Sequence, residues 1–371
     1  MKITIFGDIC PTKDTQDAFN QGDAEAIFGE TLHEIESSDI VIGNLECAVT
    51  DNPTPIKKTG PILYTTAKSI ETLRGFTALS LANNHIRDCG EDGVKTAIET
   101  CHKLGIVTFG AGQELSEAKE PLVIEKKGIK VGFMSFAEQE FNTASKDRSG
   151  AAYLDLYDDF DRIREFRKTV DCLIILYHGG IEYFPYASPD LKRKCRKFVD
   201  CGADIVTCQH SHCIGMTENY KGATIVYGQG NSIFGYRKGD SSWNTGLLLQ
   251  IYIEDKSIAT SYLGITATPS GLKFLNKKDQ KELDQLLLGR TLLSEDKIQE
   301  EWDMFCKQHA LIHLPLLLGW PRILIALNRR TNNLLVRILY GRKKQNVSHN
   351  IMRCEALYEA IRNILSKMDF E

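Results

Sequence analysis

The chain has 371 residues, of which 42% are hydrophobic and 25% are charged, and its formal net charge at pH 7 is -4. This length allows one large domain with an appendage, or two domains, and the near-neutral charge argues against a dedicated nucleic-acid-binding protein. The opening residues MKITIFGD lead directly into a strand pattern, without the apolar region and cleavage site of a signal peptide, so we expect a cytoplasmic protein. There the eleven cysteines, none of which form a C-x-x-C pair, are expected to be reduced and to lie mostly in the core.

Short β-rich runs alternate with amphipathic stretches and turn residues over the first 265 residues, which is typical of an α/β domain. Strands are predicted at 2–6, 39–43, 77–81, 106–109, 121–125, 129–136, 172–177, 204–207, 223–228, 246–253 and 257–265. Helices are predicted at 23–37, 90–104, 155–170 and 188–201. The last strands are paired runs with short turns, so we expect a mixed sheet or two packed sheets, not one parallel sheet.

After this region the pattern becomes helical, which predicts one domain over residues 1–270 and a helical, basic C-terminal appendage over residues 271–371. From Met304 to Cys354 the sequence contains nine Lys or Arg residues and no Asp or Glu. The run LIHLPLLLGWPRILIAL within it is strongly apolar, but it is short for a membrane-spanning helix and is interrupted by two prolines.

Three interpretations of this basic segment remain open. It can be a helical appendage packed on the domain, with its arginines forming a solvated face. It can be an interfacial segment whose apolar residues and Trp320 enter a bilayer while the basic cluster contacts anionic lipid. It can also bind an acidic polymer or an acidic protein through the same arginines.

Polar side chains follow five of the predicted strands at the point where each strand ends. Ligands of α/β sheets bind outside the carboxyl ends of the strands, so we expect these side chains to meet at one place. They are Asp8, Glu46, Asn84, His85, His178, His210 and His212. Each alone has an ordinary explanation, because turns, helix caps and loops commonly carry Asp, Asn and His, including the two histidines of CQHSHC. The joint pattern favours a site, since four of the nine histidines fall at three of these strand ends.

Imidazoles, carboxylates and an amide carbonyl form a mixed nitrogen and oxygen ligand set, which suits Zn, Mn or Fe(II). The donors exceed the needs of one tetrahedral ion, so two ions bridged by a carboxylate fit better. Two such ions activate water and stabilise the charge that develops in an in-line displacement. His85, next to Asn84, then remains as the candidate general acid for the leaving group.

The motifs GD, NLE, ANNH with a following D-x-G, HGG-x-EY, H-x-H and YGQGN occur in this order between Met1 and about Thr266. In these motifs the chain resembles the CapA family, which is linked to bacterial capsule and poly-γ-glutamate synthesis and is similar to the calcineurin-like metallophosphoesterases. The resemblance implies an α/β fold, a four-layer αββα sandwich with two mixed central sheets, and a site for two divalent metal ions (Mn, Zn or Fe).

The same resemblance assigns roles to individual residues. It implies that His85 is the catalytic proton donor, that Glu182 and Tyr183 face the substrate, and that Asn231 lines the pocket unless YGQGN is only a tight turn. The implied metal ligands are Asp8, Glu46, Asn84, His178, His210 and His212.

The residues at three strand ends depart from the wider phosphoesterase pattern. Cys10 stands where that pattern has the histidine of D-x-H, so Cys10 replaces a ligand or the site has one donor fewer. Asn44 and Glu46 stand where the pattern has Gly-Asp, and Glu46 is the predicted bridging ligand. Gln209 precedes the H-x-H motif where glycine is usual.

We therefore expect a metal-dependent phosphoester hydrolase that acts in capsule, exopolysaccharide or poly-γ-glutamate metabolism. A variant of this prediction is hydrolysis or transfer at an amide bond. The alternative is a non-catalytic, metal-binding subunit of a surface-polymer synthesis complex. The expected partners are a surface-polymer or phosphoester substrate and, through the basic segment, a membrane-bound biosynthetic complex or an anionic membrane surface, but no nucleic acid. The expected location is cytoplasmic and peripheral to the inner face of the membrane.

Overall fold

A computed structural model describes residues 1–12, 14–255, 257–269, 271–317 and 319–367 of the chain. They form two compact units, Met1–Gln299 and Glu300–Glu371. Residues 318 and 368–371 of the predicted appendage lie outside the described residues.

Two mixed sheets form the centre of the first unit, and every strand predicted from the sequence is present in them. In the first sheet, β1, β2, β5 and β6 run parallel to one another, while β16, β17 and β18 are antiparallel. Its strands, in spatial order, are β18 (Gly271–Phe274), β17 (Ser257–Thr268), β16 (Thr245–Glu254), β1 (Lys2–Ile9), β2 (Ile40–Leu45), β5 (Ala78–Ser80) and β6 (Val107–Phe109), with β15 (Asn231–Ile233) also paired to β1.

The second sheet has a parallel centre, β9, β11, β12 and β14, and an antiparallel strand at each edge. Its strands, in spatial order, are β13 (Thr217–Tyr220), β14 (Ala223–Val226), β12 (Ile205–Gln209), β11 (Cys172–His178), β9 (Ile129–Ala137) and β8 (Leu122–Lys126). Strand β11 is buried along its whole length, which explains its continuous run of apolar residues. Two short pairs, β3 (Ala48–Val49) with β4 (Tyr64–Thr65) and β7 (Ala111–Gly112) with β10 (Gly150–Ala151), complete the strands.

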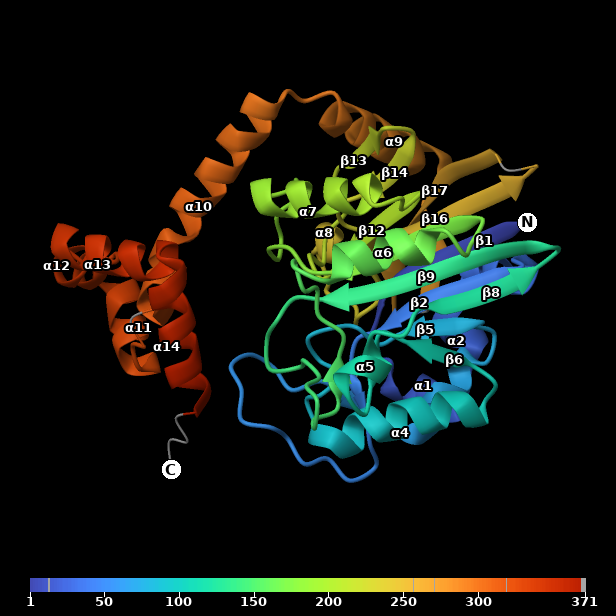
Figure 1. Ribbon diagram of the computed structural model, residues 1–371, viewed down its shortest axis with the longest axis horizontal. Coiled ribbons are helices and arrows are strands. Elements are labelled where there is room, and N and C mark those ends of the chain that lie inside the picture. Colours follow the sequence, from blue (N-terminus) through green and yellow to red (C-terminus); the bar gives the residue numbers. More distant parts are fainter. Residues whose placement is uncertain (13, 256, 270, 318, 368–371) are drawn as a thin grey trace. The chain divides into compact units, whose positions relative to one another are not determined.

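The two sheets pack face to face, and helices cover their outer faces, so the first unit is an αββα sandwich. The inner layer joins aliphatic residues of both sheets, such as Ile5 and Ile42 with Ile174 and Leu176. Helices α6 and α7 lie on the opposite side of the two sheets from α1, α2 and α4 (Figure 1). The helices of this unit are α1 (Gln16–Gln21), α2 (Ala24–Phe28), η1 (Gly29–Thr31), α3 (Leu32–Ser37), η2 (Ala67–Leu73), α4 (Gly90–Lys103), α5 (Leu115–Ala118), α6 (Asp159–Arg167), α7 (Pro189–Asp200), α8 (Ser241–Asn244) and α9 (Lys277–Thr291).

The helix predicted at 23–37 is broken into α2, η1 and α3. Gly29 is the break, because its φ of 47° is non-helical and a Cβ there would lie 2.4 Å from the carbonyl oxygen of Leu272. The break lets β18 approach the helix layer closely.

The first unit extends beyond residue 270, where the sequence placed the boundary. Strand β18 still belongs to the first sheet, and Leu283 and Leu287 of α9 enter the layer between the sheets. The second unit contains the end of α10 (Glu295–Leu317) and the helices α11 (Arg322–Arg330), α12 (Leu334–Leu339), α13 (Arg342–Arg353) and α14 (Glu355–Lys367). Across the described ranges, no helix combines the length and the apolar character needed to cross a bilayer.

Candidate metal centre

The predicted site residues come from strand ends of both sheets. Asp8 lies near the end of β1, Glu46 directly follows β2, and His178 is the last residue of β11. His210 and His212 lie in the loop after β12, and Asn84 and His85 lie in the loop after β5. The sandwich therefore brings residues that are far apart in the sequence to one edge of the two sheets.

Two groups of three side chains in this cluster could each hold a metal ion. Glu46, His178 and His210 form one group, and Asp8, Glu46 and His212 form the other. Within each group the ligand atoms lie within 4.8 Å of one another, and all of these residues are buried. Glu46 belongs to both groups, which is the position required of a bridging carboxylate.

The Glu46 carboxylate lacks the partners that a buried acid normally has. Neither of its oxygens takes part in a hydrogen bond with the residues that the structure describes, although His178 Nε2 lies 3.4 Å from Oε1. Burial raises the pKa of Glu46 well above its usual 4.5. Nδ1 of His210 is likewise buried without a partner among the described residues. Buried polar atoms are normally satisfied, so these unpartnered atoms fit a site that binds a cation.

Asp8 is held in place by two donors. Nδ2 of Asn44 donates to Oδ1 over 2.7 Å, and the backbone N–H of His210 donates to Oδ2 over 3.0 Å. Burial and the nearby Glu46 nevertheless raise the pKa of Asp8 to about 6, against the lowering effect of His178 and His212. A second buried carboxyl group with a raised pKa therefore lies beside Glu46, and a divalent cation would favour its charged form.

The His178 ring lies between the two acids and an amide. Its Nδ1 is 3.7 Å from Asp8 Oδ1, and its Nε2 is 3.0 Å from Oδ1 of Asn84. The ring centroid is 4.9 Å from that of His210. Burial lowers the pKa of His178, and it lowers that of His210 well below 6.5, so both imidazoles are neutral at pH 7, as metal ligation requires.

The loop that carries His210 and His212 has an uncommon backbone. Their φ angles are 90° and 52°, in the region that non-glycine residues rarely adopt and that is associated with functional sites. The Asn231 side chain fixes the His212 ring: Nδ2 donates to the carbonyl of Trp243 over 3.0 Å, so Oδ1 faces His212 Nδ1 at 2.9 Å. An amide oxygen only accepts, so Nδ1 carries the proton and Nε2 keeps its lone pair for a metal.

His85 belongs to a buried charged network beside the two groups. Its Nδ1 lies 2.6 Å from Oδ2 of Asp88, and the ammonium of Lys58 forms an ion pair with Oδ1 of the same carboxylate. The backbone N–H of Leu63 also donates to Asp88, over 2.7 Å. A carboxylate only accepts, so Asp88 places the Nδ1 proton and leaves Nε2 of His85 for chemistry. Burial lowers the pKa of His85, while the hydrogen bond and charge of Asp88 raise it.

The three residues assigned to substrate binding lie in different surroundings. Glu182 and Tyr183 are exposed, and the Tyr183 ring centroid lies 6.4 Å from that of His212. Partial removal of the carboxyl group from water raises the pKa of Glu182, and the nearby His85 and Arg237 lower it. Asn231 differs from the expectation: it is only 3% exposed and its side chain supports His212, because its hydrogen bonds are made there and to Trp243.

The departures from the phosphoesterase pattern have structural explanations. Cys10 is buried, its Sγ lies 3.7 Å from the carbonyl of Pro11, and it belongs to neither of the two groups. A hydrogen bond with Cys47, and then burial, raise its pKa, which disfavours the thiolate that a metal would need. The Gln209 side chain is buried and donates to the carbonyl of Phe6 over 3.3 Å, so it connects the two sheets.

Sequence reasoning missed Lys58 and gave no role to Asn44. Lys58 lies in a long loop with no periodic pattern, so nothing in the sequence indicated a buried cation. Asn44 orients both Asp8 and His178, and its place at the end of an apolar strand, two residues before Glu46, was the available signal. Asp88 is the aspartate of the D-x-G motif after ANNH, but its contact with His85 is visible only in the structure.

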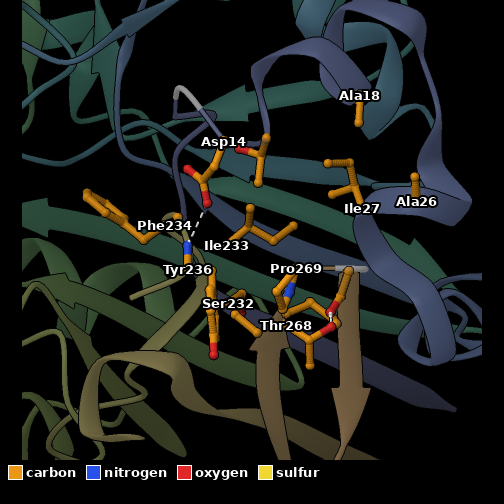
Figure 2. Close-up of a pocket in the computed structure, with 15 residues that line it drawn as sticks. Asp14, Ala18, Ala26, Ile27, Ser232, Ile233, Phe234, Tyr236, Thr268 and Pro269 are labelled. Atoms are coloured by element: carbon orange, nitrogen blue, oxygen red, sulfur yellow. Dashed lines mark hydrogen bonds between the residues drawn. The ribbon is translucent and has the colours of Figure 1, made fainter. Parts of the chain in front are cut away.

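A separate cavity of about 480 Å³ lies between α1, α2 and the loop after β15 (Figure 2). Its lining is mostly apolar, with Ile27, Ile233 and Phe234, and Asp14 accepts a hydrogen bond there from the backbone N–H of Tyr236. None of the residues of the two metal-binding groups lines it. The metal centre and this cavity are therefore distinct features.

Comparison with known proteins gives a family and relatives. The model of the family "Bacterial capsule synthesis protein PGA_cap" matches residues 2–236. Two relatives are the capsule biosynthesis protein CapA of Bacillus anthracis, 26% identical over 70% of this chain, and the PGA biosynthesis protein CapA of Bacillus subtilis, 29% identical over 66%. The matches span slightly less than two thirds of these relatives, 65% and 64% of their lengths.

Among solved structures, one similar chain is described as a novel phosphatase of Mycoplasma pneumoniae, with 14% identity and a TM-score of 0.43 over 76% of this chain and 96% of that one. The family match covers more than half of the present sequence and includes all of the strand-end residues described above. The chain belongs to the bacterial capsule synthesis protein PGA_cap family.

Proposed function

We propose that this protein is a metal-dependent phosphoester hydrolase that acts in bacterial capsule, exopolysaccharide or poly-γ-glutamate metabolism. The observation that carries the proposal is the Glu46 carboxylate, which is buried, has no hydrogen-bond partner among the described residues, and belongs to both candidate metal-binding groups. An acid in this state is costly unless a cation compensates it. The names of the relatives support the metabolic context but not the chemistry.

The residues present fit two divalent ions, of Mn, Zn or Fe. One would be held by Glu46, His178 and His210, with the half-buried Asn84 next to His178, and the other by Asp8, Glu46 and His212. When bound, such ions act as Lewis acids and lower the pKa of a coordinated water.

In this proposal His85 moves the proton to the leaving group. Its Nδ1 is held by Asp88, which fixes the direction of the ring and leaves Nε2 to exchange a proton with the substrate. Asp88 stabilises the imidazolium form, and burial opposes it. Glu182 and Tyr183, exposed beside the centre, are the residues proposed to contact the substrate.

A non-catalytic role is the second candidate, and Cys10 is the observation that favours it. This buried thiol stands where the phosphoesterase pattern has a histidine. Each group therefore offers only three described His, Asp or Glu side chains as ligands. Such a centre could stabilise a subunit of a membrane-bound polymer-synthesis complex without turnover. Either way we propose that the protein works in the cytoplasm, close to membrane-bound synthesis machinery.

Turnover assays of the metal-loaded protein separate the candidates. We expect hydrolysis of an aryl phosphate monoester or diester with added Mn or Zn, and its loss in His85→Ala but not in His33→Ala, which removes an exposed histidine. Hydrolysis of γ-glutamyl amides in place of phosphoesters would move the chemistry to amide bonds. A protein that binds two metals and turns over neither substrate class would support the non-catalytic role.

A further inference from the structure

The second unit has very little core. Among its described side chains, the buried apolar ones are Pro315, Val336 and Tyr340. Large apolar side chains are instead exposed on every helix that lies wholly within it, including Ile323 (81% exposed) and Ile338 (66% exposed). A folded unit of this size normally buries more than half of the surface of its unfolded chain, so these exposed residues indicate a surface that binds something.

The exposed apolar residues are arranged by helical periodicity. Ile323 and Leu327 are four residues apart on α11, with Leu324 beside them, and all three are exposed. We call these three residues the apolar face of α11. On α12, Leu334 and Ile338 are exposed at the same spacing.

Arginines flank this apolar face at both ends of α11. Arg322, Arg329 and Arg330 are exposed on α11 itself. Residues 304–354 contain nine Lys or Arg residues and no Asp or Glu, and none of the nine forms an ion pair within the described part of the second unit. Lys307 lies on α10 and the other eight lie on α11, α12 and α13, which are drawn in orange to red in Figure 1.

We propose that the second unit binds an anionic phospholipid bilayer, with the apolar face of α11 in the interface and the surrounding cations on the lipid phosphates. The combination of exposed aliphatic side chains and unneutralised cations on one short helix is the signature of an interfacial segment. A second copy of the chain is a poor occupant, because the like charges would repel one another. A water-soluble polyanion would use the arginines but would leave the apolar face exposed.

This binding is independent of the hydrolase chemistry, because none of its residues belongs to the metal centre. It is also compatible with the lack of a spanning helix in the described ranges, since an interfacial helix lies along the membrane surface.

Sedimentation of the full-length protein with lipid vesicles tests the proposal. We expect binding to an equimolar mixture of phosphatidylglycerol and phosphatidylcholine at low ionic strength, weaker binding at high ionic strength, and at least about tenfold weaker binding to phosphatidylcholine alone. Failure to sediment with the anionic vesicles at low ionic strength overturns the proposal, and so does equal binding to neutral vesicles.

Two pairs of variants separate the contributions of charge and apolar contact. Arg329→Gln with Arg330→Gln should weaken binding about 25-fold, whereas the exposed, adjacent pair Lys277→Gln with Lys278→Gln on α9 should leave it unchanged.

For the apolar contact, Ile323→Gln with Leu327→Gln should weaken binding about tenfold or more. The control is Leu288→Gln with Leu292→Gln, an exposed leucine pair at the same spacing on the first unit. Circular dichroism should show unchanged helix content in all four variants.

The outcome for the apolar pair decides between occupants. If the charge variant loses binding but the apolar variant does not, and a soluble polyanion such as polyglutamate competes fully, the occupant is a polyanion and the proposal is wrong. If the wild-type protein is a dimer in solution that the apolar variant makes monomeric, a second copy covers the face and the proposal is also wrong.

Discussion

Nε2 of His178 lies 3.4 Å from Oε1 of Glu46, yet neither oxygen of that carboxylate takes part in a hydrogen bond within the described ranges. Asp8, with a pKa raised to about 6, lies beside the same pair. A protein interior does not normally hold two neighbouring acids of which one has no hydrogen-bond partner. The arrangement is reasonable if cations bind between these acids and the histidines, and the predictions below follow from it.

Glu46→Gln should show both how much the buried acid destabilises the metal-free protein and whether it binds metal. The amide keeps the shape of the side chain and removes an acid that burial makes costly to ionise, so we expect the metal-free variant to be more stable than the wild type at pH 7, by about 1–3 kcal/mol. The same variant should lose the stabilisation that added metal gives the wild type. Urea denaturation with and without chelator measures both effects.

The exposed acid Glu36 on α3 offers the matched control for this experiment. Glu36→Gln should change neither the metal-free stability nor the response to metal. A Glu46→Gln protein that is as strongly stabilised by metal as the wild type would show that this carboxylate is not a ligand.

The contribution of Asp8 to the stability of the metal-free protein should fall as the pH rises through the acidic range. The pKa of Asp8 is raised from 3.8 to about 6 in the folded protein, so between these values the folded state holds a proton that the unfolded state has released. The contribution of Asp8 to the free energy of unfolding is therefore highest below about pH 4. It decreases by about 3 kcal/mol as the pH rises to about 6, and it is constant above that pH.

Denaturation of chelator-treated wild type and Asp8→Asn across this pH range measures the contribution as the difference between the two proteins, because the buried histidines, whose pKa values are lowered, give an opposite slope in both. Metal and proton compete for the same carboxylate, so stabilisation by metal should fade below about pH 6. An Asp8→Asn variant with the pH profile of the wild type would contradict the assignment of this titration to Asp8.

His85→Ala should remove turnover without removing metal. His85 belongs to neither metal-binding group, and its Nδ1 is held by Asp88, so its loss should lower kcat about 10²- to 10⁴-fold at unchanged metal content. Steady-state kinetics with elemental analysis of the same sample gives both numbers. Loss of metal in His85→Ala would place this histidine among the ligands.

Asp88→Asn should destabilise the fold because it leaves the buried Lys58 ammonium without its anion. Removing one partner of a buried pair costs about 3–5 kcal/mol, and the double variant Lys58→Met with Asp88→Asn should recover much of that loss. The exposed pair Lys168 and Glu165 provides the matched double-mutant cycle, for which we expect a coupling of about 0.5 kcal/mol or less. Equal coupling in the two pairs would show that the Lys58 network is not a buried ion pair in solution.

Local pattern predicted the main strands and a mixed sheet or two packed sheets, because central strands such as β11 are continuous apolar runs that are buried along their whole length. The four-layer sandwich was an implication of the family resemblance. Among the strands that were missed, β3 and β7 have two residues each and carry no periodicity. The helix predicted at 23–37 is interrupted at Gly29, where the close approach of β18, far along the chain, overrides the local pattern.

The cluster at the strand ends followed from topology, since parallel strands of one layer end on the same side. The contacts that orient the ligands did not follow from it. Lys58 meets Asp88 thirty residues later, and Asn231 meets His212 across a loop, so these partners depend on tertiary packing that no local spacing encodes.

The direct test of the central claim is the metal content of the full-length protein, purified without chelator and without a histidine-rich tag. Elemental analysis should find about two ions of Mn, Zn or Fe per chain, because Glu46 is shared by two groups of ligands. In Glu46→Gln the content should fall to about one ion or less. A wild-type protein that retains no transition metal after incubation with an excess of these ions, or that retains only one, would contradict a dinuclear centre.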